Sequence, residues 1–199
     1  LWTALSGAKN LLDFACEKKI EKMVFLSSME AFGTVDGNQR TPEEKLGYID
    51  LRKVRSCYQE SKRMIENMCV CYSSEYGVPV TIARLAQTFG AGVSSEDTRV
   101  FAQFAHSAMT GEDIVLHTAG TSCGNYVYTA DAATAIFTLL KKGSLGRSPL
   151  SFVMMPKTTS FTLSGPSADA KDAFASGRSF EALSLNAASD LTSMVETYP

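Results

Sequence analysis

Segments with helical and strand patterns alternate along most of this chain, and this alternation limits its possible folds more than any other feature. Apolar residues at helical spacing predict the helices, and short runs rich in β-branched residues predict the strands. The expected helices cover about 4–18, 56–77, 99–111 and from 131 onward, and the expected strands 22–28, 78–85, 113–117 and a short one from 125. Such lengths indicate βαβ units. We expect an α/β fold with a doubly wound, mostly parallel sheet covered on both faces.

Composition excludes several classes of protein. The 199 residues are 45% hydrophobic, enough for one sizeable core, and the net charge of −2 argues against nucleic acid or an anionic membrane as a partner. No apolar run is long enough to span a bilayer, and the first residues lack the features of a signal peptide. The five cysteines are odd in number and lack the usual zinc or redox spacing. We therefore expect reduced thiols, a cytoplasmic location and no metal site.

Polar residues follow the strand in "VFLSSMEAFG", at the point where apolar residues stop. Ser27, Ser28 and Glu30 stand there, and Leu85 to Gln87 end the next strand along the chain. In parallel sheets of this kind, ligands bind beyond the carboxyl ends of the strands. The position therefore favours a chemical role over simple exposure to solvent.

The segment "YQESK" places Tyr58 and Lys62 four residues apart, on the same face of one helix. A tyrosine phenol is a poor base at neutral pH, but a neighbouring ammonium favours its ionised form. A serine such as Ser28 would bond the substrate oxygen that loses its proton. The trio suits proton abstraction from an alcohol coupled to hydride transfer. The motif alone is weak, since an exposed helical pair gives the same spacing.

Taken together, "VFLSSMEAFG", "CYQESK" and "VPVTIARLAQTFGAG" resemble the extended short-chain dehydrogenase/reductases that act on nucleotide sugars. The resemblance covers residues 1 to about 145, an NAD-binding domain with part of a small substrate-binding lobe. It implies bound NAD, a nucleotide-diphosphate sugar that passes through a 4-keto form, and a homodimer. By the same resemblance, Tyr58 is the base, Lys62 holds the nicotinamide ribose and Ser28 bonds the reacting oxygen. Ser27 and Leu85 are expected to line the cofactor.

The residues after the first strand bear on which reaction follows oxidation. The 4,6-dehydratases carry an acid where this chain has Met29, which cannot donate a proton, while Glu30 is retained as a second-step acid or base. The UDP-glucuronate decarboxylases are more similar, with a pattern like "RSCYQESK". Gln87 replaces the asparagine that usually contacts the sugar diphosphate, and Arg99 is a candidate to supply a cation there. A solvated acid at Glu30 and a surface arginine at Arg99 are the alternatives.

The resemblance is partial at both ends. The chain contains no Gly-x-x-Gly-x-x-Gly turn of the kind that seats a pyrophosphate, so we expect an N-terminally truncated fragment, inactive by itself. Residues 146–199 are rich in Ser and Ala, and we interpret 147–199 as a frameshifted, poorly ordered tail. A genuine but divergent Ser-rich segment is the alternative.

Two other functions are compatible with the sequence. One is an NAD(P)-dependent reductase of a non-sugar ketone within the same superfamily. The other is a non-catalytic, redox-sensing dinucleotide-binding protein. The presence of Ser28, Tyr58 and Lys62 counts against the non-catalytic alternative, whereas the missing diphosphate contacts count for it.

Overall fold

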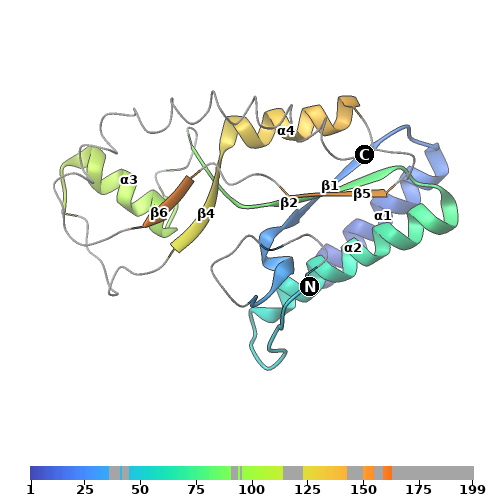
Figure 1. The fold of residues 1–199 in the computed structure, drawn as a ribbon, viewed down its shortest axis with the longest axis horizontal. Helices are drawn as coiled ribbons and strands as arrows, with labels where there is room; N and C mark the ends of the chain where they lie inside the picture. The colour runs from blue at the N-terminus through green and yellow to red at the C-terminus, as the bar shows by residue number, and fades with distance from the viewer. Residues whose placement is uncertain are drawn as a thin grey trace. The chain divides into compact units, whose positions relative to one another are not determined.

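The computed structural model describes residues 1–35, 41, 45–90, 94, 96–113, 123–142, 150–154 and 159–162. It divides into two compact units, drawn in Figure 1. The first unit is formed by Leu1–Leu85 with the described part of Thr134–Met155. The second is formed by Ala86–Ala133 with the described part of Pro156–Glu196.

The first unit is a parallel sheet with helices on both faces. Its elements are α1 (Trp2–Lys18), β1 (Met23–Ser28), the 3-10 helix η1 (Met29–Phe32), α2 (Ser56–Tyr76), β2 (Val80–Leu85), the later part of α4 (Thr129–Lys142) and β5 (Leu150–Met154). The strand order is β1-β2-β5, and both pairings are parallel. Figure 1 shows α1 and α2 on one face of this sheet and α4 on the other. The predicted doubly wound arrangement is therefore confirmed.

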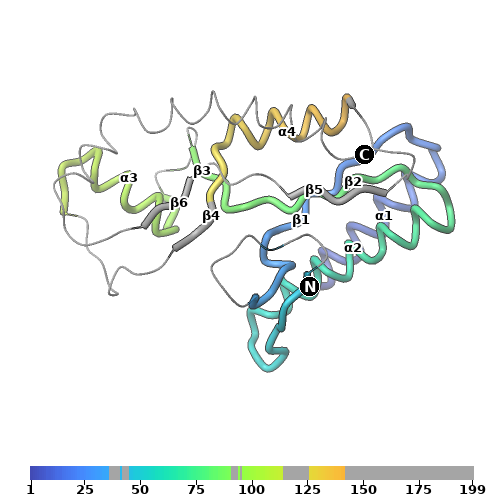
Figure 2. The backbone as a smooth tube through the Cα atoms, viewed as in Figure 1, coloured from blue at the N-terminus to red at the C-terminus, as the bar shows by residue number. Residues whose placement is uncertain are grey.

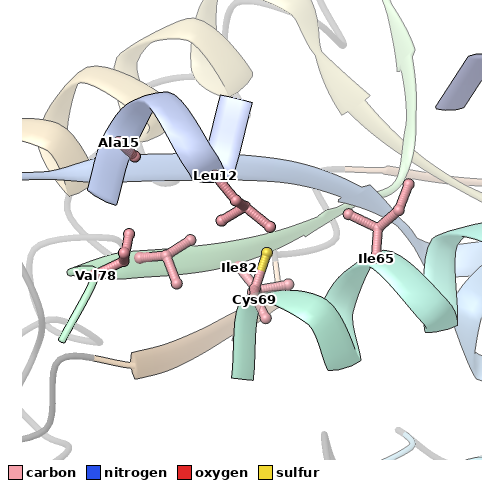
Figure 3. Close-up of a cluster of buried hydrophobic side chains, with 7 residues drawn as sticks. Leu12, Ala15, Ile65, Cys69, Val78 and Ile82 are labelled. Carbon is pink, nitrogen blue, oxygen red and sulfur yellow. The ribbon is translucent and has the colours of Figure 1, made fainter. Parts of the chain in front are cut away.

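The core of the first unit lies between α1, α2 and β2. Its buried members are Leu12, Ala15, Ile65, Cys69, Val78, Val80 and Ile82. Leu12 and Cys69 face each other between the helices in Figure 3. Complete burial of a leucine or isoleucine side chain, such as Leu12 or Ile82, stabilises a fold by about 1.5–3 kcal/mol. This cluster fixes both helices against the strands whose ends carry the predicted site.

Glycines end two helices, as the sequence predicts. The backbone of Gly77 is left-handed, with φ 69°, and its N–H donates to the carbonyl of Ser73 at the end of α2. Gly111 ends α3 (Val100–Thr110) in the same way, with φ 76°. Glycine adopts this conformation without the steric cost that a Cβ atom brings. The C-terminal limits of both helices are therefore confirmed.

The second unit holds β3 (Gln87–Phe89), α3, β4 (Cys123–Tyr128), the start of α4 and β6 (Thr159–Thr162). Strand β4 pairs in parallel with β3 and antiparallel with β6. The ring of Phe101 on α3 stacks edge-on against Phe89 and Tyr126, at centroid distances of 4.9 and 5.8 Å. Figure 2 traces the backbone of these elements. Of the strand predicted at 113–117, all but the first residue lies outside the described part of the chain.

Two strands, β5 and β6, fall in the region that the sequence assigned to an atypical tail. Strand β5 extends the sheet of the first unit, and β6 pairs with β4 in the second. The rest of 147–199 lies outside the described residues, and the frameshift stays a prediction. Among the residues described, no helix is both long and apolar enough to cross a membrane. Nor does the described part contain a group of three metal-ligating side chains.

Candidate active site

The ends of β1 and β2 lie side by side, because Ser28 pairs in register with Leu85. The Ser28 hydroxyl caps η1 by accepting a hydrogen bond from the Glu30 backbone N–H at 3.2 Å. A serine hydroxyl has one proton to donate as well as lone pairs. The cap uses a lone pair of Ser28 and leaves its proton available for another oxygen atom.

Tyr58 and Lys62 come together on α2, as their spacing predicts. The Lys62 Nζ donates to the Leu26 carbonyl of β1 at 2.8 Å and lies 5.8 Å from the centre of the Tyr58 ring. It also lies 5.1 Å from the centre of the Phe25 ring. Tyr58 is 42% exposed, so the side chain is accessible to a ligand. Burial lowers the pKa of Lys62, and the charge of Glu66 opposes this shift.

Glu30 lies on η1, two residues after Ser28, and pairs with Arg55, the residue that precedes α2. The carboxylate is partly buried, whereas the guanidinium is largely exposed. The sequence did not predict this pair, since Glu30 and Arg55 stand 25 positions apart. A carboxylate paired with a guanidinium keeps a fixed direction. Such a group suits the second-step role predicted for Glu30.

Ser27 is turned away from solvent. It is 4% exposed, and its hydroxyl donates to Glu66 Oε1 of α2 at 2.5 Å. Side chains alternate between the two faces of a strand, so Ser27 and Ser28 point in opposite directions. The hydroxyl of Ser27 is engaged by protein, and its predicted role beside a cofactor stays a prediction.

The Glu66 carboxylate is also the partner of Arg84, in a buried pair that the sequence analysis missed. The Arg84 guanidinium donates from Nε to Oε1 at 3.0 Å and from Nη2 to Oε2 at 2.7 Å. The side chains of Arg84 and Glu66 are only 5% and 6% exposed. The guanidinium lies 4.7 Å from the centre of the Phe32 ring. The signal in the sequence was an arginine inside the apolar strand "VTIARL".

Arg63 on α2 fixes the chain that follows η1. Its guanidinium donates to the carbonyls of Ala31 at 2.7 Å, Phe32 at 3.2 Å and Gly47 at 2.7 Å. Gly33 turns with φ 68°, where a Cβ atom would meet the Tyr48 carbonyl oxygen at 2.8 Å. These contacts hold Glu30 against the N-terminal half of α2.

The predicted substrate-binding residues belong to the second unit. Gln87 is exposed at the start of β3 and pairs in register with Tyr126. Arg99 precedes α3, and its guanidinium pairs with Asp97 through Nε at 2.9–3.0 Å and through Nη2. The hydrogen bonds from Arg99 lower the pKa of Asp97. The cation predicted for the sugar diphosphate therefore has a carboxylate partner of its own, and both roles stay predictions.

A model of the NAD dependent epimerase/dehydratase family matches residues 1–154, more than half of the chain. The chain belongs to this family. The family resemblance and the Rossmann-like fold expected from the sequence are therefore confirmed, and the match extends past residue 145.

Curated relatives of this epimerase/dehydratase chain include decarboxylases. UDP-glucuronic acid decarboxylase 1 of Xenopus tropicalis is 30% identical over 141 residues, covering 70% of this chain and 33% of the relative. UDP-glucuronic acid decarboxylase 3 of Arabidopsis thaliana is 29% identical over 145 residues, covering 72% of this chain and 42% of the relative. The chain thus spans well under half the length of these relatives.

Solved structures of the epimerase/dehydratase fold superpose on the chain. The dTDP-glucose 4,6-dehydratase from Bacillus anthracis, in complex with NAD, has a TM-score of 0.67 at 22% identity and covers 81% of this chain and 48% of that one. The UDP-glucose 4-epimerase from Thermotoga maritima, with UDP-glucose, has a TM-score of 0.68 at 22% identity and covers 81% and 50%. At such identities the likeness establishes a common fold.

Proposed function

We propose that this chain carries the proton-transfer part of the active site of an NAD-dependent nucleotide-sugar enzyme that works through a transient 4-keto sugar. One observation carries the proposal. The Lys62 ammonium is held by the Leu26 carbonyl close to the Tyr58 ring, on the helix beside the strand that ends in Ser28. The match to the NAD dependent epimerase/dehydratase family supports the choice of cofactor.

The residues present fit part of an NAD site. The Lys62 ammonium and the exposed Tyr58 hydroxyl are the kinds of donor that hold ribose hydroxyl groups. When bound, NAD would accept a hydride from the C4 atom of the sugar, and its reduced form would return it. A glycine-rich pyrophosphate turn is absent from these 199 residues. We therefore propose that this chain holds the nicotinamide ribose through Tyr58 and Lys62.

The first step needs a base for the proton of the sugar C4 hydroxyl. In our proposal, Tyr58 in its phenolate form takes this proton while the C4 hydrogen leaves as a hydride, and the C4–O bond becomes a carbonyl. The Lys62 ammonium stabilises the phenolate through its positive charge. Ser28 donates its free proton to the C4 oxygen and orients it.

The second step follows from the acidity that a C4 ketone confers on its neighbours. We propose decarboxylation of a uronic-acid nucleotide sugar, because a C6 carboxylate then lies β to the ketone and its C–C bond electrons pass into an enolate. Met29 lacks a proton for the elimination of water, and the curated relatives cited above are decarboxylases. As carbon dioxide leaves, Glu30, oriented by Arg55, delivers to C5 a proton taken up from solvent. The reduced cofactor, when bound, would return hydride to C4, and Tyr58 would return its proton to the C4 oxygen.

The substitution Tyr58→Phe tests the first step. The relatives extend well beyond the matched region, so the assay uses a chimera in which residues 1–154 replace the matching part of the Xenopus tropicalis decarboxylase. We expect turnover to fall by roughly 10²–10⁴-fold, the usual contribution of a general base. Tyr76→Phe, at the end of the same helix, is the matched control and should keep the parental rate. Parental turnover by Tyr58→Phe would refute the proposal.

Product analysis tests the second step. With a UDP-uronic acid as substrate, mass spectrometry distinguishes loss of carbon dioxide, loss of water and an isomer of unchanged mass. We expect loss of carbon dioxide. An isomer of unchanged mass shifts the proposal to epimerisation, and loss of water shifts it to dehydration.

Assembly and location complete the proposal. The family resemblance implies a homodimer in the cytoplasm, and both remain proposals for this protein. Sedimentation velocity of the chimera tests the first, with a species of twice the chain mass expected.

A further inference from the structure

Glu66 is the centre of a buried network that joins several elements of the first unit. It accepts hydrogen bonds from Ser27 of β1 and from Arg84 of β2, and Arg84 in turn stacks on Phe32 of η1. The network members stand next to the predicted site residues along the chain: Ser27 beside Ser28, Arg84 beside Leu85, and Glu66 one helical turn after Lys62. The network and the predicted site therefore share the same elements, β1, β2 and α2.

Lys62 and Glu66 are natural partners for each other. They stand four residues apart on α2, and side chains at this spacing meet on the helix surface. The structure instead gives each of them a different partner. Lys62 donates to the Leu26 carbonyl near Tyr58, and Glu66 accepts hydrogen bonds from Nε and Nη2 of the Arg84 guanidinium.

We propose that Arg84 binds the Glu66 carboxylate and offsets its negative charge, so that the Lys62 ammonium stays beside the Tyr58 ring. Glu66 and Arg84 are then positioning residues. The part of this inference that concerns catalysis rests on the proposed function. The part that concerns the charge of Lys62 does not. A bidentate guanidinium suits this task, because two parallel hydrogen bonds fix both carboxylate oxygens at once.

The other described charges on elements that pack against α2 have partners of their own. Glu30 of η1 is paired with Arg55, and Lys9 and Asp13 of α1 are paired with each other. On α2 itself, Arg63 donates to three carbonyls and contacts Glu60. The negative charge of Glu66 opposes the lowering of the Lys62 pKa that burial causes.

The test compares two variants of the 199-residue chain by NMR titration of lysine side chains. Arg84→Met removes the guanidinium and leaves Glu66 free to attract Lys62. We expect the titration midpoint of Lys62 to move to higher pH by about one unit, because an unshielded opposite charge one helical turn away favours the ammonium form. The double variant Glu66→Gln with Arg84→Met removes both charges and should abolish most of this increase. Lys62→Arg identifies the signal.

An unchanged Lys62 midpoint in a folded Arg84→Met chain would overturn the proposal. If Arg84→Met does not fold, Glu66→Gln replaces it, since this change removes the attracting charge and keeps an acceptor for Ser27. There the Lys62 midpoint should move to lower pH, and an unchanged midpoint refutes the coupling. A purely structural role would alter stability without moving the midpoint in opposite directions in the two single variants.

Activity in the chimera separates this inference from the proposed function. In Arg84→Met the pH–rate profile should differ from that of the parent chimera, because Lys62 is drawn away from Tyr58, and the double variant should restore the parental profile. A chimera whose Tyr58→Phe variant turns over at the parental rate refutes the function and leaves the Lys62 titration interpretable. An NMR shift without any change in the profile overturns the positioning role alone.

Discussion

The two units hold their charged residues in different ways. In the first, Glu66 and Arg84 are buried and join a helix to a strand across 18 positions of sequence. In the second, Arg99 pairs with Asp97, two positions away, on an exposed loop before α3. One pair depends on the tertiary fold, whereas the other can form within a short segment of chain.

This difference bears on how each unit presents its predicted site residues. A buried, bidentate pair fixes the direction of both side chains and of the elements that carry them. An exposed local pair is weak, because water screens the charges and the long side chains lose entropy. The proposed catalytic residues lie beside the first kind of contact, and Arg99, a proposed substrate-binding residue, belongs to the second. We therefore expect substitutions to affect the two units unequally.

The largest difference should appear on removal of the two arginines. Arg84→Met leaves a buried carboxylate without its partner, and we expect a loss of about 3–5 kcal/mol in the free energy of unfolding. Arg99→Met is the matched control and should cost less than about 1 kcal/mol, because the Arg99 side chain is 57% exposed. Urea denaturation monitored by circular dichroism measures both. Equal losses of unfolding free energy in the two variants would contradict the proposed difference between the two units.

A second prediction concerns the aromatic cluster around Phe101, which we expect to stabilise the second unit more than its ion pair does. Phe101 is 7% exposed and packs against the rings of Phe89 and Tyr126, so Phe101→Ala should cost about 3 kcal/mol. Val100→Ala, at the preceding and exposed position, is the control and should cost less than about 0.5 kcal/mol. Urea denaturation followed by tyrosine fluorescence reports the change. A cost for Phe101→Ala as small as that of its control would show that this aromatic cluster does not support the unit.

The smallest predicted effect is a change with pH in the free energy of unfolding, caused by the Cys69 thiol in the core of the first unit. Burial raises the pKa of the Cys69 thiol from 9.0 to about 12. The folded state therefore keeps this proton at a pH where the unfolded state releases it. The stabilisation is complete below pH 9 and is lost as pH rises toward about 12, with a slope of about 1.4 kcal/mol per pH unit.

Cys69→Ala tests this by removing the titrating group. Urea denaturation at several values between pH 8 and 10.5, with a reductant present, compares the variant with the parent chain. The difference in unfolding free energy between the two chains should shrink above pH 9, since the parent alone loses this contribution. Cys71→Ala, an exposed thiol on the same helix, should follow the parent. A constant difference between Cys69→Ala and the parent contradicts the prediction.

Much of the first unit was predictable from local patterns. Apolar periodicity predicted α1 and α2, a short apolar run predicted β1, a run rich in β-branched residues predicted β2, and Gly77 predicted the end of α2. The spacing of Tyr58 and Lys62 predicted their common helix face, and the strand ends predicted that Ser28 lies beside Leu85. Each of these depends on geometry that repeats every two or 3.6 residues, which a sequence displays directly.

The order of helices and strands, the sheet edge of the candidate site and the family of the chain all follow from the sequence alone. The packing of the chain adds that Ser27 turns to Glu66, that Glu66 pairs with Arg84 and that Arg55 holds Glu30. The partners in these contacts stand between 18 and 39 positions apart. No local periodicity encodes such a distance, because the contact exists only after the sheet and α2 have packed together and excluded water from the charges.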